Sequence, residues 1–259
     1  MNRPKIFLTI GGSDPSGGAG IQADIKTATR LGLYPTSVIT TLTAQNTFEI
    51  NGLWPVCPEV LKAQMYAVLS DMEPDAVKIG MIMSEEAIEI IADAIKKFHL
   101  KNIVLDPIVA PTLSNQHQNV ELIKKMVGRL FPICSLITPN MPEKDVFEAI
   151  TNTTFNNMCK AYLLKGGHQN GSVCIDRLYI KGNQDNSVSM TCKEYSHAKS
   201  ETANTHGSGC VLSSAIACFL AQGKKLDEAT ELAINFIENS IEISSRSKLG
   251  KGNYGPILI

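Results

Sequence analysis

The segment IFLTIGGSDPSGGAGIQADIKTATRL, residues 6–31, sets a pattern that the rest of the chain repeats. It begins with an apolar run, Ile6 to Ile10, which predicts a buried strand, and it ends with Ile21 to Leu31, which predict a helix. A glycine-rich loop joins the two. Because glycines let a backbone approach a ligand closely, we interpret this loop as a binding loop rather than a tight turn without a ligand.

Short apolar runs and amphipathic stretches go on alternating along the chain. The apolar runs predict further strands at residues 37–42, 76–79, 103–105, 135–138 and 162–164. The other periodic stretches predict helices at residues 60–69, 87–98, 120–127, 211–221 and 226–243. Between residues 172 and 195 the pattern changes to strand-type alternation around a polar turn at 181–186, which predicts a hairpin.

This order of elements predicts an α/β fold with a mostly parallel central sheet and helices on both faces. No repeat, low-complexity tract or linker interrupts it, so we expect a single domain over residues 1–259. Sheets of this kind bind ligands in crevices beyond the carboxyl ends of their strands. Polar residues at those strand ends are therefore the candidate site residues.

The composition excludes several classes of protein and of binding partner. With a net charge of −1 over 259 residues, no basic field attracts nucleic acid, and small molecules are the expected partners. The seven cysteines are an odd number without a C-x-x-C pair, which argues against a disulfide framework or a structural zinc site. The first apolar run is too short for a signal peptide, and residues 211–221 are too few to span a bilayer. We therefore expect a cytoplasmic protein without a membrane partner.

Two nucleotide-binding motifs do not fit the first loop. Residues 18–23, GAGIQA, match the dinucleotide pattern G-x-G-x-x-A. The acid that should bind the ribose belongs at the end of the second strand, but no carboxylate occurs there until Glu49. A Walker loop would need a Gly-Lys-Ser/Thr triplet, which does not follow these glycines. A nicotinamide-dependent oxidoreductase is therefore the weaker interpretation.

The most specific motif is NTHGSGC, residues 204–210, directly before a long apolar helix. Gly207, Ser208 and Gly209 let successive N–H groups turn inward, and the helix adds its positive end, so this turn is a candidate anion hole for phosphate oxygens. Cys210 lies in the first helical turn, where a thiolate is favoured and could take a proton from an attacking hydroxyl. Packing beneath the helix is the alternative, which we prefer for Cys218.

Three further strand ends carry residues suited to phosphate chemistry. Asp106 ends one strand, a usual place for a carboxylate that orients Mg²⁺ or phosphates. Asn140 and Glu143 are three residues apart and could form a metal-water or phosphate site, although a capped helix N-terminus explains the same spacing. Lys165 follows another strand, from which a lysine can reach phosphates. Phosphoryl transfer relies on such positioning and charge stabilisation.

With these motifs in place, the chain resembles the hydroxymethylpyrimidine and phosphomethylpyrimidine kinases of thiamine biosynthesis, which have a ribokinase-like fold. The matching stretches follow the family's order over nearly the whole chain: GGSDPSGGAGIQADIKT (11–27), LTAQNT (42–47), KIGM (78–81), VLDP (104–107), ITPNMPE (137–143), LLKGGH (163–168), NTHGSGC (204–210) and GKGNYGP (250–256).

The resemblance implies a kinase that uses ATP and Mg²⁺ to phosphorylate 4-amino-5-hydroxymethyl-2-methylpyrimidine, its monophosphate or both. Cys210 would be the catalytic base, where most ribokinase relatives carry aspartate, and residues 207–209 would form the anion hole. Gln45 would hydrogen-bond the aminopyrimidine. Members of the family are commonly homodimers.

The resemblance also assigns the walls of the site. The residues placed around the ring would be Gly12, Asp24, Met81 and Ile108. Asp106, Asn140 and Glu143 would serve Mg²⁺ and phosphates, and Lys165 would serve the nucleotide phosphates. Residues 110–115, APTLSN, depart from the family's usual Lys-Ser-Gly-like loop, which bears on how a phosphorylated substrate is held.

Two other functions fit parts of the same pattern. A pyridoxal kinase of this lineage would share the glycine loop and the cysteine, but Gln45 favours the pyrimidine, because an amide can pair a donor and an acceptor with an aminopyrimidine edge. A non-catalytic ligand-binding relative would keep the fold without turnover. The retention of Cys210 and Asp106 counts against it.

Overall fold

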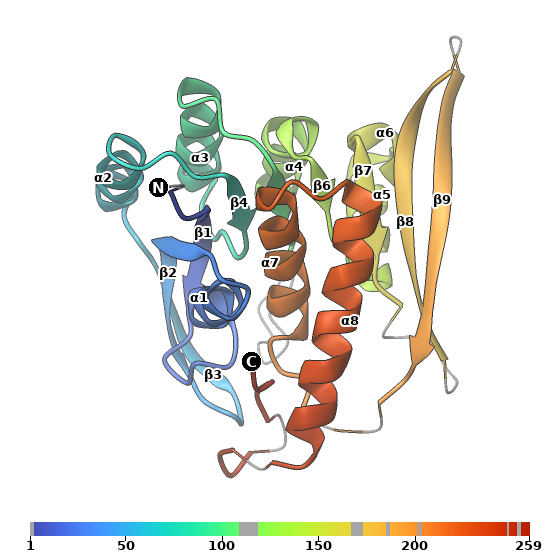
Figure 1. Cartoon of the computed structure of the whole chain (residues 1–259). Helices are drawn as coiled ribbons and strands as arrows, with labels where there is room; N and C mark the ends of the chain where they lie inside the picture. Colours follow the sequence, from blue (N-terminus) through green and yellow to red (C-terminus); the bar gives the residue numbers. More distant parts are fainter. Residues whose placement is uncertain are drawn as a thin grey trace.

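The computed structural model describes residues 3–108, 119–166, 173–184, 187–200, 202, 204–247, 249–252 and 255–259. Within these residues the strands form one nine-stranded sheet in the order β3-β2-β1-β4-β5-β6-β7-β8-β9 (Figure 1). The strands are β1 Ile6–Ser13, β2 Tyr34–Gln45, β3 Ile50–Pro55, β4 Ala76–Ile79, β5 Ile103–Leu105, β6 Leu136–Ile137, β7 Ala161–Leu164, β8 Val173–Gln184 and β9 Ser187–Ala198. Neighbouring strands from β2 through β1 to β7 are parallel, whereas β3, β8 and β9 add antiparallel pairs at the two edges. The sheet is therefore mostly parallel, as predicted.

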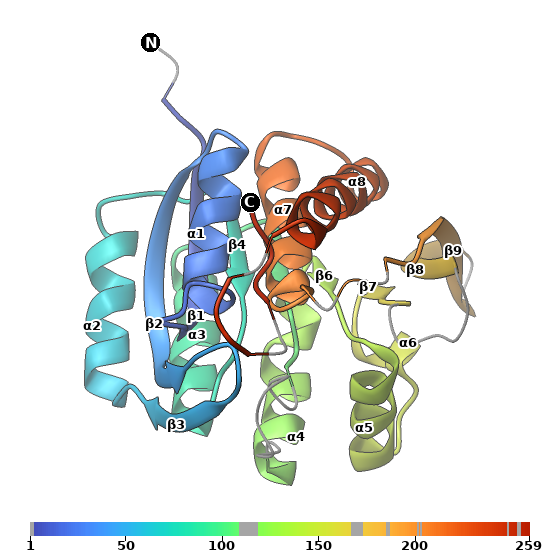
Figure 2. The same cartoon turned by 90° about the horizontal axis from the view of Figure 1, so that it is seen from below.

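Helices cover both faces of this sheet (Figure 2). They are α1 Gly20–Arg30, α2 Pro58–Leu69, α3 Glu85–Lys97, α4 Val120–Arg129, the 3₁₀ helix η1 Phe131–Ile133, α5 Met141–Thr151, α6 Phe155–Met158, α7 Ser208–Ala221 and α8 Leu226–Ser245. Helices α1, α7 and α8 pack on one face, and α2 to α6 pack on the other. Among the described residues, no helix combines the length and apolar character needed to cross a bilayer.

The central strands divide their side chains between two apolar cores. In β5, Ile103 and Leu105 point into the core beneath α2 to α6, whereas Val104 points into the core beneath α1, α7 and α8. This follows from the two-residue period of a strand. Because both faces are buried, the strand is apolar at every position, which is why the sequence shows short continuous apolar runs.

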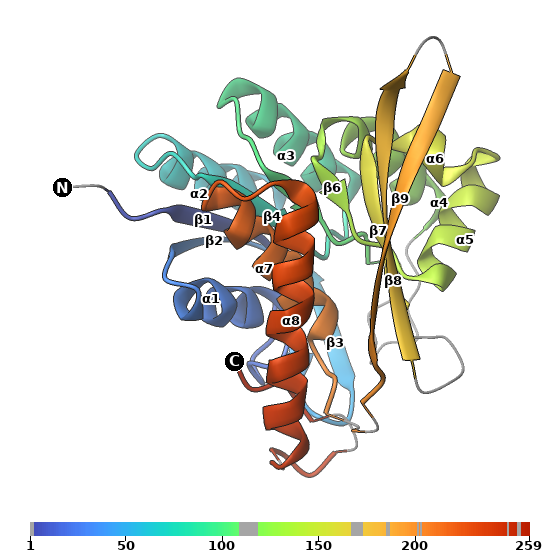
Figure 3. The ribbon, with the colours of Figure 1, turned by 45° about the vertical axis from the view of Figure 1, so that its right-hand side comes forward.

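Four elements are not predicted by the sequence pattern: β3, α5, α6 and the three-residue η1. β3 contains a glycine and ends in a proline, so its own strand signal is weak, and it forms by antiparallel pairing with β2 at the edge of the sheet. α5 buries only Glu143 and Phe147, which gives it little apolar periodicity. α6 has four residues and is too short to produce a period. The predicted hairpin is confirmed as β8 and β9, two 12-residue strands at the far edge (Figure 3).

Candidate active site

A cavity of about 320 Å³ opens at the carboxyl ends of the parallel strands. Its lining comes from the loop after β1, the turn before α7 and the ends of β2, β4, β5, β6 and β7. This volume lies within the range of small-molecule sites. The cavity therefore brings together motifs that are distributed from residue 11 to residue 210.

The two glycine-rich segments touch each other inside this cavity. Gly207 has a φ of +85°, and a Cβ added to it would collide with the carbonyl oxygen of Gly18. A Cβ added to Gly18 would in turn lie 2.7 Å from Cδ2 of His206. The close approach requires glycine at both positions, so these glycines serve the contact between the first loop and the turn before α7.

Asp14 organises the first loop. Its carboxylate accepts hydrogen bonds from the backbone N–H groups of Ser16 at 2.8 Å, Gly18 at 3.1 Å and Ala19 at 2.8 Å. Burial alone would raise the pKa of this carboxyl, but the hydrogen bonds from His206 and Ser16 outweigh burial and lower it. Asp14 is therefore a buried anion that folds the glycine loop around itself.

The turn at residues 207–209 offers N–H groups to a ligand. The first bond within α7 runs from the N–H of Val211 to the carbonyl of Gly207 at 2.9 Å, so the N–H groups of Gly209 and Cys210 precede the helical pattern. The N–H of Ser208 differs from the prediction, because it already donates to the carbonyl of Thr205 at 3.1 Å. Gly209 and Cys210 are therefore the stronger candidates for binding phosphate oxygens.

Cys210 lines the cavity and is 8% exposed. Burial raises the pKa of its thiol to about 11, although the Lys78 ammonium and the N–H of Gly20 act in the opposite direction. The expectation that the helix terminus stabilises a thiolate is therefore wrong, because loss of water outweighs the dipole. At neutral pH the thiol keeps its proton.

Lys78, which lines the cavity, forms a buried ion pair with Asp24, which does not. Nζ of Lys78 lies 2.9 Å from both oxygens of Asp24, and the two side chains are 1% and 0% exposed. Asp24 also accepts hydrogen bonds from Thr9 and from Ser214. Asp24 therefore does not line the cavity, and its expected place around the ring is not what the structure shows.

Lys78 was not singled out by the sequence, although it lines the cavity. Burial would lower the pKa of its ammonium, but the negative charges of Asp24 and Asp106 outweigh burial and raise it. The available signal was a single lysine inside the otherwise apolar strand Ala76–Ile79. A buried lysine in such a strand must be paired with an anion.

Asp106 and Lys165 form a second ion pair at the next strand ends. Nζ of Lys165 lies 2.9 Å from Oδ1 of Asp106, which also accepts a hydrogen bond from Thr138 at 3.1 Å. Burial opposes ionisation, but Lys165 and Lys78 lower the pKa of the Asp106 carboxyl. A Cβ added to Gly209 would lie 3.3 Å from Oδ2 of Asp106 and 3.5 Å from Nζ of Lys165. Both charges therefore face the turn before α7.

Asn140 and Glu143 form the helix cap that explains their spacing, and they also line the cavity. The side chain of Asn140 accepts from the N–H of Glu143, and Oε2 of Glu143 accepts from the N–H of Asn140, each at 2.8 Å. This is a capping box at the start of α5. Both residues also line the cavity, and Oε2 of Glu143 lies 3.9 Å from Nζ of Lys165. The helix cap therefore holds a carboxylate beside the ion pair.

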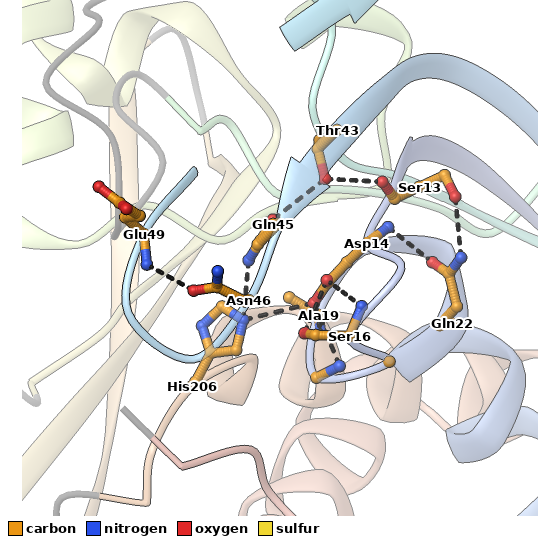
Figure 4. A network of polar contacts seen from close by, with 12 residues as sticks. Ser13, Asp14, Ser16, Ala19, Gln22, Thr43, Gln45, Asn46, Glu49 and His206 are labelled. Atoms are coloured by element: carbon orange, nitrogen blue, oxygen red, sulfur yellow. Dashed lines mark hydrogen bonds and ion pairs between the residues drawn. The ribbon is translucent and has the colours of Figure 1, made fainter. Parts of the chain in front are cut away.

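Gln45 enters the cavity from the end of β2 and meets His206 (Figure 4). The Gln45 amide nitrogen lies 2.9 Å from Nε2 of His206, which also lies 3.4 Å from Oδ2 of Asp14. Within the part of the chain that the structure describes, Nδ1 of His206 is buried without a partner. Nε2 of His206 thus contacts both Gln45 and Asp14. Whether Nε2 carries a proton decides whether it donates or accepts, so the tautomer of His206 and the orientation of the Gln45 amide depend on each other.

The remaining predicted wall residues, Gly12, Met81 and Ile108, all line the cavity. A Cβ added to Gly12 would lie 2.5 Å from Cε of Met81, so the glycine leaves room for that side chain. The segment at residues 110–115 lies outside the described residues, as do Gly167 and His168 of the LLKGGH motif. The structure therefore brings together the predicted site residues except Asp24.

Comparison with known proteins finds relatives that match nearly the whole chain. A family model described as phosphomethylpyrimidine kinase matches residues 14–257. The hydroxymethylpyrimidine/phosphomethylpyrimidine kinase of Rhizobium meliloti (strain 1021) is 37% identical, over 97% of this chain and 96% of the relative. A solved phosphomethylpyrimidine kinase from Clostridium difficile 630 superposes with a TM-score of 0.75 at 36% identity, covering 92% of this chain and 99% of that chain. A Bacillus subtilis pyridoxal kinase, solved as an ADP complex, superposes with a TM-score of 0.85 at 28% identity, covering 98% of this chain and 97% of that chain.

Proposed function

The chain belongs to the phosphomethylpyrimidine kinase family, and we propose that its cavity transfers the terminal phosphoryl group of ATP to 4-amino-5-hydroxymethyl-2-methylpyrimidine, to its monophosphate or to both. One observation carries the assignment of the reaction to this cavity. The turn at residues 207–209 packs on the glycine loop of residues 11–20, so the anion hole, Cys210 and Gln45 share one space.

Each group has a defined task in this proposal. With the alcohol as substrate, the hydroxymethyl oxygen attacks the terminal phosphorus of ATP, the bond from that phosphorus to ADP breaks, and the hydroxyl proton passes to Cys210, which acts through its thiolate form, a minor fraction at neutral pH. With the monophosphate as substrate, a phosphate oxygen is the nucleophile instead. The N–H groups of Gly209 and Cys210 bind the oxygens of the migrating phosphoryl group, where charge develops. Lys165 adds positive charge on the nucleotide side, beside Gly209.

The strand ends fit a Mg²⁺ ion. Mg²⁺ prefers oxygen ligands and usually takes one or two carboxylates together with substrate phosphates. Asp106 offers a buried carboxylate that faces the turn before α7, and Asn140 and Glu143 line the same cavity. We assign these three residues to the Mg²⁺–phosphate side; when bound, the ion would neutralise charge on the phosphates.

The pyrimidine would lie between Gln45 and the apolar wall. The amide of Gln45 supplies a donor and an acceptor to an aminopyrimidine edge, and Met81 and Ile108 supply apolar contact with the ring. Pyridoxal phosphorylation is the second candidate, because the Bacillus subtilis pyridoxal kinase superposes well on this chain. The family match and the higher identity to pyrimidine kinases favour the pyrimidine.

We also propose that residues 1–259 act as one kinase domain and that two chains pair through the β2–β3 edge. Leu42 and Trp54 are cross-strand partners there, and they are 49% and 57% exposed. Phe48, between the two strands, is also exposed. Large apolar side chains gathered at a sheet edge mark a protein contact.

All seven cysteines are free thiols, which suits a reducing compartment such as the cytoplasm.

The test is ATP turnover with two alcohols and one phosphate monoester. We expect ADP release with the hydroxymethylpyrimidine, and a kcat/KM at least about tenfold above that for pyridoxal, since one well-placed hydrogen bond gives a discrimination of this order. The monophosphate of the pyrimidine is assayed in parallel, because the structure does not describe residues 110–115. A preference for pyridoxal, or undiminished turnover in Cys210→Ala, would overturn the assignment.

A further inference from the structure

A second cluster of reactive side chains lies outside the cavity, at the base of the β8–β9 hairpin (Figure 3). Cys174 and Asp176 are two residues apart on β8, so both side chains project from the same face. His197 of β9 is the register partner of Cys174 and therefore shares that face. One potential ligand atom from each of the three residues lies within 4.8 Å of the other two.

The imidazole of His197 is held in one orientation. Its Nδ1 lies 3.0 Å from Oε1 of Glu238 on α8, and its Nε2 lies 3.2 Å from Oδ2 of Asp176. Both ring nitrogens thus face carboxylate oxygens, to which ring N–H groups donate. A metal ion would displace the proton of Nε2, whose lone pair would then point toward Asp176 and Cys174, while the N–H of Nδ1 stays bonded to Glu238. Histidines that bind metal ions are commonly oriented this way, by a carboxylate that accepts from the other ring nitrogen.

The spacing of the three ligand atoms suits a tetrahedral ion. Zinc bonds of about 2.0 to 2.3 Å place neighbouring ligand atoms about 3.3 to 3.8 Å apart. The distance of 3.2 Å between Nε2 of His197 and Oδ2 of Asp176 is close to one such edge. Because the sulfur of Cys174 lies within 4.8 Å of both atoms, a side-chain shift of about 1 Å completes the set.

The cluster is buried but can be reached from solvent. Cys174 and Asp176 are 6% and 5% exposed. His197 and Glu238 line a cavity of about 270 Å³ between β9 and α8, which opens to the surface. An ion can therefore enter beside the imidazole, and a water molecule can occupy the fourth position.

We propose that Cys174, Asp176 and His197 bind a divalent transition-metal ion of the zinc type, with Glu238 orienting the histidine. One sulfur, one imidazole nitrogen and one carboxylate oxygen select zinc over magnesium, which prefers oxygen ligands alone. The site is separate from the proposed Mg²⁺ position at Asp106, and it goes beyond the kinase reaction. The absence of C-x-x-C pairs does not bear on this site, which is assembled from C-x-D and a histidine 21 residues further on.

The test uses Co²⁺ as a spectroscopic probe for zinc. Chelator-treated full-length protein is titrated with Co²⁺ in excess Mg²⁺, so that the oxygen-ligand site stays filled. We expect one Co²⁺ per chain, a thiolate-to-cobalt band in the near ultraviolet, and loss of both signals when Zn²⁺ is added. Absence of the near-ultraviolet band, or a band that Zn²⁺ does not displace, would overturn the proposal.

Variants locate the sulfur ligand. Cys174→Ser and His197→Gln should each abolish the near-ultraviolet band, while Cys57→Ser and Cys192→Ser should keep it, because these two cysteines are exposed and outside the cluster. Asp176 is left unchanged, because Oδ1 of Asp176 also accepts from the N–H of Gly166, next to Lys165. A band that survives in Cys174→Ser refutes the site.

A measurement on the unaltered chain covers the case in which Cys174→Ser does not fold. Zinc-edge X-ray absorption of the zinc-loaded protein should show one sulfur and about three lighter ligands around the ion. A shell without sulfur, or with two or more sulfurs, contradicts the proposed ligand set.

Discussion

The amide nitrogen of Gln45 and Nε2 of His206 lie 2.9 Å apart, although 161 residues separate them in the chain. This contact joins the end of β2, which we expect to recognise the pyrimidine, to the turn that we expect to bind phosphate. Phosphoryl transfer requires the bound acceptor and the terminal phosphate of ATP to lie next to each other. If the turn that we expect to bind phosphate lay far from Gln45, the kinase assignment would have no structural basis.

The first prediction concerns recognition by Gln45. Replacing it with leucine removes the amide but keeps much of the volume, and should raise KM for the pyrimidine alcohol by about 10- to 100-fold, because an unpaired buried polar group costs about 1 to 3 kcal/mol. KM for ATP should change little. Steady-state kinetics check this, with Gln222→Leu as control, since Gln222 is exposed and its side-chain amide donates to the carbonyl of Leu31. An unchanged KM for the pyrimidine contradicts the role.

The second prediction concerns pH. A general base works in its deprotonated form, and the pKa of Cys210 is raised to about 11. Below that pKa the thiolate fraction rises tenfold per pH unit, so log kcat/KM should climb with a slope of about one between about pH 7 and pH 10.

The aspartate variant provides the comparison for this pH dependence. In Cys210→Asp the base starts from an ordinary aspartate pKa of about 3.9, so even the same upward effect of burial as on the Cys210 thiol leaves its pKa below neutrality. The profile should then be flat across the same range. Identical profiles for the two enzymes would mean that residue 210 does not accept the proton.

The third prediction concerns the buried pair of Lys78 and Asp24. Lys78→Met leaves the Asp24 carboxylate buried without its cation, which should lower the free energy of unfolding by about 3 to 5 kcal/mol. Urea denaturation measures this change in the free energy of unfolding. The double variant Lys78→Met with Asp24→Leu should recover most of the loss, because no unpaired charge remains. Equal loss in the single and double variants would show that packing, not charge, is responsible.

The pH dependence of this pair has a definite sign. The anions around Lys78 raise the pKa of its ammonium above the ordinary lysine value of 10.5. The stabilisation is therefore complete below pH 10.5 and is lost only as the pH rises through the folded-state pKa. Lowering the pH from about 10 to about 7 should therefore leave the stabilisation by the Lys78 ammonium unchanged.

The strand ends could be predicted because parallel sheets place them together. Asp106, Asn140 and Lys165 each follow a short apolar run, and the carboxyl ends of such strands meet at one edge. The contact between Gly18 and Gly207 had no equivalent signal, because it depends on how α1 and α7 pack against each other. Glycine motifs indicated loops but not which loops would touch.

The misassigned residues share a physical cause. Asp24 was expected around the ring, yet it lies in α1, where its side chain turns down toward Lys78 and away from the cavity. Periodicity does not reveal which buried acid pairs with which buried base. The pKa of Cys210 was misjudged for a similar reason, since the sequence shows a helix start but not how completely water is excluded there.

The fourth prediction concerns Lys165. Lys165→Met removes the charge that pairs with Asp106 and faces Gly209, and should lower kcat/KM for ATP by about 10- to 100-fold, the range expected for one charge-assisted hydrogen bond. Lys160→Met is the matched control, because Lys160 is exposed and precedes the same strand. If only the KM for the pyrimidine changed, Lys165 would bind the pyrimidine and not ATP, contrary to this prediction.

The fifth prediction separates backbone strain from loop contact at the turn before α7. Gly207 and Gly223 both have positive φ, +85° and +87°, so alanine at either position costs about 1 to 2 kcal/mol in backbone strain. A Cβ at Gly223 has nothing within 4 Å, whereas a Cβ at Gly207 collides with the carbonyl oxygen of Gly18. Gly207→Ala must therefore push the phosphate-binding turn off the glycine loop, and kcat should fall by about 100-fold or more, since a displacement near 1 Å has effects of this size. Gly223→Ala should lose stability in urea denaturation but keep kcat; equal kcat values in the two variants would show that the contact between the loops is not needed for catalysis.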